Sequence, residues 1–68
     1  MTVGERIKQL REVKGWSRKD LRNAIGEVSY QTVSSIELDV VKPSLNMVGK
    51  ICKAFGLEPE EFFKGVEL

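Results

Sequence analysis

The sequence SRKDLRNAIGEVSYQTVSSIE, residues 17–37, has the local signals of two short helices joined by a turn. Ser17 is a suitable N-cap for the first helix, and Asp20 three positions later completes a variant of the capping box. Gly26 ends this helix, and Ser29 is the next N-cap. The first helix has only about nine residues, too few to be stable alone. Neighbouring segments must therefore pack against it.

The second helix of this pair has two chemically different faces. Val33 and Ile36 have the spacing of a buried stripe. The other face carries side chains that donate and accept hydrogen bonds: Tyr30, Gln31, Ser34 and Ser35, with Thr32 between the two faces. Such a face is most often plain solvent-exposed surface, but amide and hydroxyl groups can also bind the edges of base pairs.

Helical signals continue on both sides of this pair. Apolar residues at helical spacing run from Val3 to Val13, Ser44 caps another apolar stripe that Gly56 ends, and a last helix begins near Pro59. No run with the two-residue period of a strand occurs. The sequence therefore predicts an all-α fold, a compact bundle of five short helices in which the second and third form a helix-turn-helix. The predicted core contains Leu10, Leu21, Ile25, Val33, Ile36, Val48, Ile51 and Phe55.

Composition limits the classes of protein to which the chain can belong. Its 68 residues, 41% hydrophobic and 31% charged, suit one folded domain spanning residues 1–68. A single cysteine, Cys52, excludes an internal disulfide and is expected to fill the core, and the lack of histidine removes the usual zinc sites. No metal, cofactor or membrane span is expected, and no paired nucleophile and base indicates an enzyme. A reducing cytoplasm is the expected compartment.

Charge is distributed unevenly along a chain whose net charge is only +1. Residues 1–36 hold seven Lys or Arg against four acids, whereas residues 37–68 hold four against six. A basic N-terminal half can form a local surface for an anionic partner such as nucleic acid. A normally solvated surface explains the same charges equally well.

Most of the chain resembles one known family, in five stretches: RIKQLR (6–11), GWSRKDL (15–21), VSYQTVSSIE (28–37), KPSL (42–45) and KAFGLEPEEFF (53–63). Together they make the chain similar to the lambda-repressor-like helix-turn-helix family, the Cro/Xre group of phage and bacterial regulators. No single stretch is specific, but the ordered set is. The resemblance implies sequence-specific binding of double-stranded DNA by a homodimer on a two-fold operator, and transcriptional control as a repressor.

The resemblance also implies which residues meet DNA. In this family the third helix lies in the major groove and the second crosses the backbone. Base reading then falls to Tyr30, Gln31, Ser34 and Ser35, of which Gln31 can pair with adenine. Phosphate contacts fall to Ser17, Arg18, Arg22, Thr32, Lys42 and Ser44, helped by two helix N-termini. The resemblance further pairs Glu37 with Arg11 as a structural ion pair.

Three positions depart from the family pattern. Arg22 stands where most members have a small residue, and Glu27 lengthens the turn by one residue. Asp39 stands where glycine is more usual, although aspartate tolerates the left-handed conformation after a helix. We expect the longer turn to tilt the third helix or move it outward, which gives Arg22 room to reach solvent or a phosphate. Groove contacts can then fall at shifted residues.

The C-terminal tail and the choice of partner leave alternatives open. The tail, residues 64–68, is expected to be flexible or to lie at a dimer interface, whose candidate residues are Phe62, Phe63, Val66 and Leu68. The alternative to DNA binding is a protein-interaction or antitoxin-like module that keeps the helical bundle. The longer turn and the low net charge favour that alternative, whereas the two phosphate sites oppose it. A regulatory protein partner is compatible with both functions.

Overall fold

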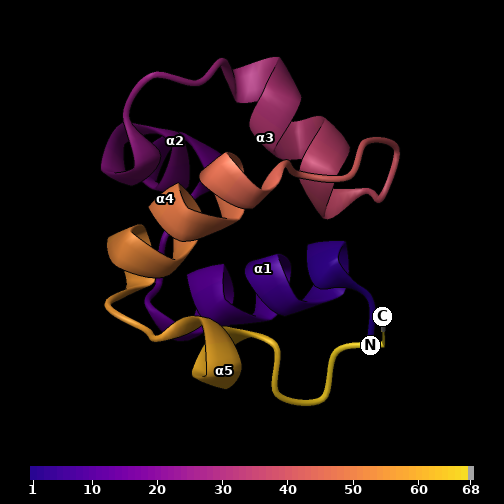
Figure 1. Cartoon of the computed structure of the whole chain (residues 1–68). Helices are drawn as coiled ribbons and strands as arrows, with labels where there is room; N and C mark the ends of the chain where they lie inside the picture. Colours follow the sequence, from indigo (N-terminus) through magenta and orange to yellow (C-terminus); the bar gives the residue numbers. More distant parts are fainter. Residues whose placement is uncertain (68) are drawn as a thin grey trace.

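The computed structural model describes residues 1–67, which form five helices and no strand (Figure 1). The helices are α1 (Val3–Val13), α2 (Arg18–Ile25), α3 (Tyr30–Glu37), α4 (Leu45–Phe55) and α5 (Pro59–Phe62). The prediction of an all-α bundle with α2 and α3 as consecutive short helices is confirmed. No helix in this described part is long and apolar enough to cross a membrane.

A hydroxyl side chain caps the N-terminus of each of the first four helices. Ser17, Ser29 and Ser44 occupy these positions as predicted, and Thr2 caps α1. At the start of α2 the capping box is reciprocal: the Asp20 N–H donates to Ser17 Oγ at 3.1 Å, and the Ser17 N–H donates to Asp20 Oδ2 at 2.8 Å. These bonds satisfy N–H groups that have no partner inside a helix.

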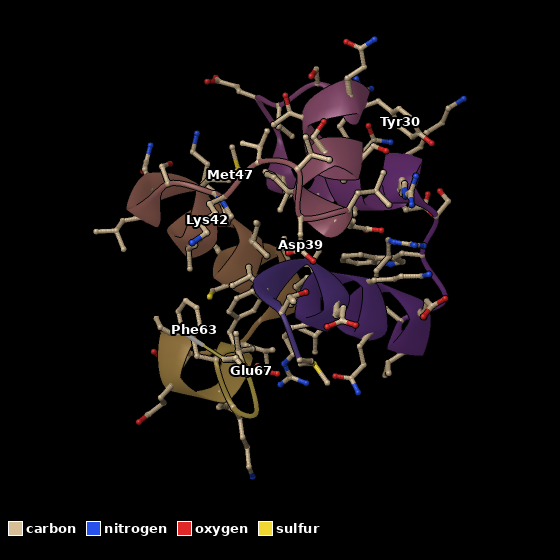
Figure 2. All side chains as sticks on the ribbon, turned by 90° about the vertical axis from the view of Figure 1, so that its right-hand side faces the viewer. Tyr30, Asp39, Lys42, Met47, Phe63 and Glu67 are labelled. Carbon is tan, nitrogen blue, oxygen red and sulfur yellow. The ribbon has the colours of Figure 1, made fainter. Side chains whose placement is uncertain are left out.

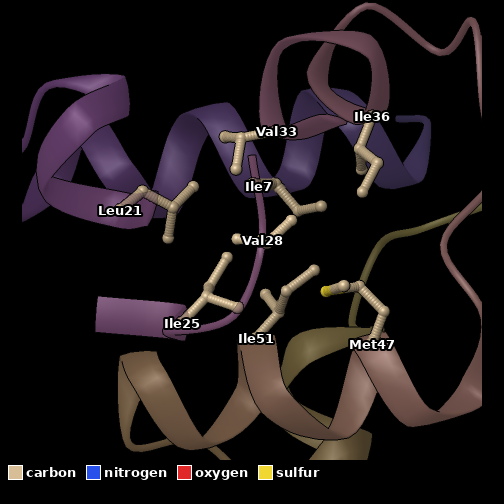
Figure 3. Close-up of a pocket in the computed structure, with 8 residues that line it drawn as sticks. All are labelled: Ile7, Leu21, Ile25, Val28, Val33, Ile36, Met47 and Ile51. Atoms are coloured by element: carbon tan, nitrogen blue, oxygen red, sulfur yellow. The ribbon is translucent and has the colours of Figure 1, made fainter. Parts of the chain in front are cut away.

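The core lies between the first four helices and is closed from one end by α5 (Figures 1 and 3). Its buried apolar residues are Ile7, Leu21, Val33, Ile36, Val48, Ile51, Cys52, Phe55 and Phe62. The predicted core residues Leu10 and Ile25 are only partly buried and pack against this cluster from its edge. A space of about 10 Å³ remains at its centre, roughly one water molecule in size and lined by apolar groups, so the core does not hold a ligand.

Two helices meet very closely where α1 begins and α3 ends. A Cβ atom on Gly4 would lie 2.5 Å from the carbonyl oxygen of Glu37, so no larger residue fits there. Asp39 adopts the left-handed conformation, with φ of 60°. Its carboxylate accepts hydrogen bonds from the Thr2 hydroxyl at 2.6 Å and from the Gly4 N–H at 3.1 Å. Asp39 thus holds the start of α1 through a side chain that a glycine lacks.

The C-terminal tail runs back beside the N-terminus (Figure 1). The Glu67 N–H donates to the Met1 carbonyl at 2.9 Å. Phe62 is fully buried, so it is a core residue and not the dimer-interface candidate that the sequence suggested. Phe63 and Val66 are half-buried and remain candidates, whereas Leu68 lies outside the described residues.

Candidate nucleic-acid interface

The outward face of α3 carries the four side chains predicted to read bases. Burial of Val33 and Ile36 fixes which way this helix is rotated. Tyr30, which is 44% exposed, lies on the outside of its first turn (Figure 2). Gln31 is also exposed in that turn, whereas Ser34 and Ser35 are half-buried in the second. The N-terminal turn of α3 is therefore the most accessible part of this face.

Thr32 lies between the two faces of α3, as predicted. Its backbone N–H donates to Ser29 Oγ at 3.1 Å, and the two hydroxyl oxygens of these residues are 2.8 Å apart. The Thr32 side chain is therefore part of the N-cap of α3 and is half-buried. A phosphate that reaches Thr32 would also meet the start of this helix.

The carboxylate of Glu37 is bonded to Arg11 of α1, the pair that the family resemblance implied. Arg11 Nε donates to Glu37 Oε2 at 2.7 Å, and Arg11 Nη2 donates to Glu37 Oε1 at 3.2 Å. Arg11 Nη1 also donates to the carbonyl of Trp16 at 2.8 Å. The hydrogen bond to Glu37 raises the pKa of Arg11 above its ordinary value, and desolvation only partly opposes this. The guanidinium is therefore a permanent cation beside a carboxylate that is wholly buried.

A second arginine, Arg18 of α2, reaches the same carboxylate. Arg18 Nε donates to Glu37 Oε1 at 3.2 Å, and Arg18 Nη1 donates to Ser34 Oγ at 3.1 Å. The side chain is 28% exposed. Arg18, which the sequence suggested as a phosphate contact, is thus held against α3 through Nε and Nη1. Its Nη2 has no acceptor in the described part of the chain.

The remaining phosphate candidates lie at the start of α2, within α2 and just before α4. Ser17 Oγ accepts from the Asp20 N–H, and a hydroxyl that accepts one bond can still donate its hydrogen. The Arg22 side chain is exposed, and among residues 1–67 it donates only to the neighbouring Asn23, at 3.2 Å. Lys42 and Ser44 are both exposed just before α4. Figure 2 shows Lys42 well apart from Tyr30, so this phosphate candidate lies away from the first turn of α3.

Glu27, which the family resemblance marks as an extra residue, lies at the outer side of the turn between α2 and α3. Gly26 has φ of 100°, a conformation that other residues rarely adopt, and its carbonyl accepts from the Val28 N–H at 2.6 Å. Glu27 is exposed, whereas Val28 packs against the core beside Ile25 (Figure 3). The expected outlet for Arg22 toward solvent is consistent with its exposure.

One stretch of surface outside α3 is unusually apolar. Four exposed aliphatic side chains fall within eight consecutive positions after α3, and we call this set of residues the apolar patch: Leu38, Val40, Val41 and Leu45. A shallow groove beside the patch is lined in part by Val48 and Phe63. Figure 2 shows Lys42 and Glu67 on either side of Phe63 along this face. Neither the patch nor the capping role of Asp39 was predicted from the sequence.

Similarity to known proteins extends over most of the chain. A family model described as helix-turn-helix matches residues 7–62. The uncharacterized HTH-type transcriptional regulator YgzD of Bacillus subtilis (strain 168) is 41% identical over 58 residues, which cover 85% of this chain and 86% of the relative. The uncharacterized HTH-type transcriptional regulator MJ0272 of Methanocaldococcus jannaschii is 36% identical over 58 residues, with the same coverage of both chains.

A longer relative shows the same relationship. The HTH-type transcriptional regulator PuuR of Escherichia coli (strain K12) is 31% identical over 67 residues, which cover 98% of this chain but only 36% of the relative. The similar region is therefore one part of PuuR and nearly all of YgzD. The α2–turn–α3 geometry, the family match and these relatives lead to one conclusion: the chain belongs to the helix-turn-helix family of DNA-binding transcriptional regulators.

Proposed function

We propose that the chain recognises a specific sequence in double-stranded DNA and represses transcription by occupying that operator. The observation that carries the proposal is the orientation of α3. Its apolar face is buried, and its first turn presents Tyr30 and Gln31 to solvent. A Gln amide in the major groove can pair with adenine through two hydrogen bonds. In this role α3 lies in the groove, and Ser35 adds a hydroxyl from its second turn. The protein acts in the cytoplasm, where bacterial and archaeal chromosomes lie.

Phosphate contacts would set the position of α3 in the groove. We assign them to Ser17, Arg22, Thr32, Lys42 and Ser44, together with the free Nη2 of Arg18. The first N–H groups of α2 and α4 add donors, because a helix leaves them without internal partners. Such contacts supply affinity for any duplex, whereas the side chains of α3 supply the preference for one sequence.

We further propose that two copies bind together on a two-fold operator. One chain measures 25 × 24 × 21 Å, so it covers less than the roughly 34 Å that separate adjacent half-sites on DNA. The apolar patch supports this assembly, because large aliphatic side chains on a small domain are most stable when a partner covers them.

Selection from random duplex DNA at low salt tests the proposal. We expect an enriched, roughly palindromic motif, bound with an affinity that falls steeply as salt rises. Sedimentation of the complex should give two chains per duplex. A protein that enriches no motif even at low salt would contradict the proposal. The alternative, an interaction module whose partner is another protein, would then be favoured by the apolar patch and the low net charge.

A further inference from the structure

The Glu37 carboxylate is shared between arginines from two different helices. Arg11 of α1 takes both carboxylate oxygens, at 2.7 and 3.2 Å, and is itself anchored by the Trp16 carbonyl. This one guanidinium already balances the buried negative charge. Arg18 of α2 adds a third bond, to Oε1, so the cluster carries one positive charge more than neutrality requires. Neutralisation alone therefore does not explain why Arg18 is held there.

The second bond of Arg18 indicates what it does. Its Nη1 donates to Ser34 Oγ, one turn before Glu37 on the same helix. Arg18 is the first residue of α2, and Ser34 and Glu37 lie in the second half of α3. Both ends of this bridge are far from the turn that joins the helices. The bonds from Arg18 to Ser34 and Glu37, here called the Arg18 clasp, therefore join α2 and α3 at the end opposite their covalent connection.

The turn itself fixes the helix pair only weakly. Four residues, 26–29, separate α2 from α3, and the bond between them in the turn is a short one from Val28 to Gly26. Two eight-residue helices joined by such a turn take their mutual angle from side-chain contacts: Leu21 and Val33 pack in the shared core, and the Arg18 bonds add a restraint at the far end. An arginine that bridges two acceptors in a planar fork restricts that angle much more than a single bond would.

We propose that Arg18 is a specificity-determining positioning residue, which holds α3 at the angle at which its first turn meets base edges. This inference rests on the proposed DNA-binding function. The clasp uses one lone pair of Ser34 Oγ, and in this proposal Ser34 supports α3 while sequence reading falls to Tyr30, Gln31 and Ser35. Arg18 contacts DNA only through Nη2, as one phosphate contact among several.

Lysine at position 18 separates positioning from charge. Arg18→Lys keeps the positive charge and a donor for phosphate but cannot bridge two acceptors in a fork. We expect it to lower the ratio of specific to non-specific affinity by roughly tenfold, about the loss of one base contact. Affinity for a scrambled duplex and the slope of its logarithm against salt should stay at wild-type values. Lys19→Arg is the matched control, since Lys19 is exposed on the same helix and is not assigned to DNA, and it should leave both quantities unchanged.

Ser34 supplies the second arm of the experiment. Ser34→Ala should lower the same ratio without changing the preferred base at any position, and the double variant with Arg18→Lys should be no worse than Arg18→Lys alone. A new base preference at one position in Ser34→Ala would mean that Ser34 reads a base directly. An unchanged ratio in Arg18→Lys would overturn the proposal. So would a loss of affinity in Arg18→Ala that is equal for the specific and the scrambled duplex, because the proposal expects the specific duplex to lose more.

A DNA-free measurement distinguishes failure of the clasp from failure of the proposed function. In the free protein, the Nε–H of Arg18 should exchange slowly with solvent, and Arg18→Lys should shift the NMR signals of residues 34–37. If wild-type protein selects no duplex while Nε–H is protected, the proposed function fails and the clasp is purely structural. If wild-type protein selects a motif but Nε–H is unprotected and Arg18→Lys reads it normally, the function stands and the clasp proposal is wrong.

Discussion

Replacing Arg11 with methionine tests how the buried carboxylate of Glu37 is held. Arg11 donates two hydrogen bonds to that carboxylate, and bonds to a charged group contribute about 1.5–3 kcal/mol each. The gross loss is therefore on the order of 3–6 kcal/mol. We expect about 3–4 kcal/mol, because Arg18 remains bonded to Oε1 and keeps the buried charge partly compensated. Methionine preserves the apolar stem, so packing changes little.

Urea unfolding followed by far-ultraviolet circular dichroism measures these losses. Arg18→Gln alone should lower the free energy of unfolding by about 1 kcal/mol. The loss is small because the Arg18 side chain is partly exposed and because Arg11 still compensates the Glu37 carboxylate. The double variant, Arg11→Met with Arg18→Gln, should cost at least about 1 kcal/mol more than the sum of the single losses. The reason is that only the double variant leaves Glu37 buried without a cation. The dependence of unfolding free energy on urea should stay constant across the series.

Additive losses, within about 0.5 kcal/mol, would refute the reasoning, because they would show that the two arginines do not share one carboxylate. A matched control replaces both members of the primary pair, Arg11→Met with Glu37→Leu. This apolar pair should regain most of the lost stability, since no charge is stranded. If this double variant regains no stability, Arg11 stabilises the fold mainly through its bond to the Trp16 carbonyl and not through Glu37.

Four further variants test the reading face, a phosphate contact, the apolar patch and the core. Gln31→Ala should relax preference at one or two base pairs by about 1–3 kcal/mol each in competition among duplexes, whereas Lys42→Ala should weaken all duplexes alike and lower the salt slope by about one phosphate. An unchanged motif in Gln31→Ala would place base reading elsewhere. Leu45→Asp, at a side chain that is 90% exposed, should leave urea unfolding unchanged but weaken self-association at least about tenfold in sedimentation; equal self-association would remove the patch from the interface. Burial raises the pKa of the Cys52 thiol. A raised folded pKa gives stability that is present below the unfolded pKa and lost as pH rises toward the folded one, so the melting temperature should fall above about pH 9, and fall less in Cys52→Ala. Identical alkaline profiles would mean that the thiol is not buried in solution.

The elements of the fold were largely predictable because their signals are local. Ser17, Ser29 and Ser44 each cap a helix within three residues of their own position, so a single sequence contains the whole signal. Apolar spacing similarly identifies the buried face of a helix. It does not tell how far along that face the core extends, which is why Leu10 and Ile25 lie at its edge. The burial of Phe62 rather than Phe63 depends on where α5 packs, and spacing alone did not separate these neighbours.

The candidate site was predictable only where its contacts are local or shared with a family. The outward rotation of Tyr30 and Gln31 follows from the burial of Val33 and Ile36 on the same helix. The bonds from Arg18, in contrast, reach partners 16 and 19 residues away, and the bond from the Thr2 hydroxyl to the Asp39 carboxylate spans 37. Such contacts depend on how helices meet, and no pattern within one helix contains that information.

We expect Glu27, which the family resemblance marks as an extra residue in the turn, to have little effect on the reading face. Glu27 is exposed while Val28 packs against the core, so the added residue lies at the outer side of the turn. The rotation of α3 follows from its own buried face, Val33 and Ile36. In our proposal the Arg18 clasp holds the angle between α3 and α2 from the far end. Base reading should therefore stay at the first turn of α3, and a selected motif that Gln31→Ala leaves unchanged would contradict this expectation.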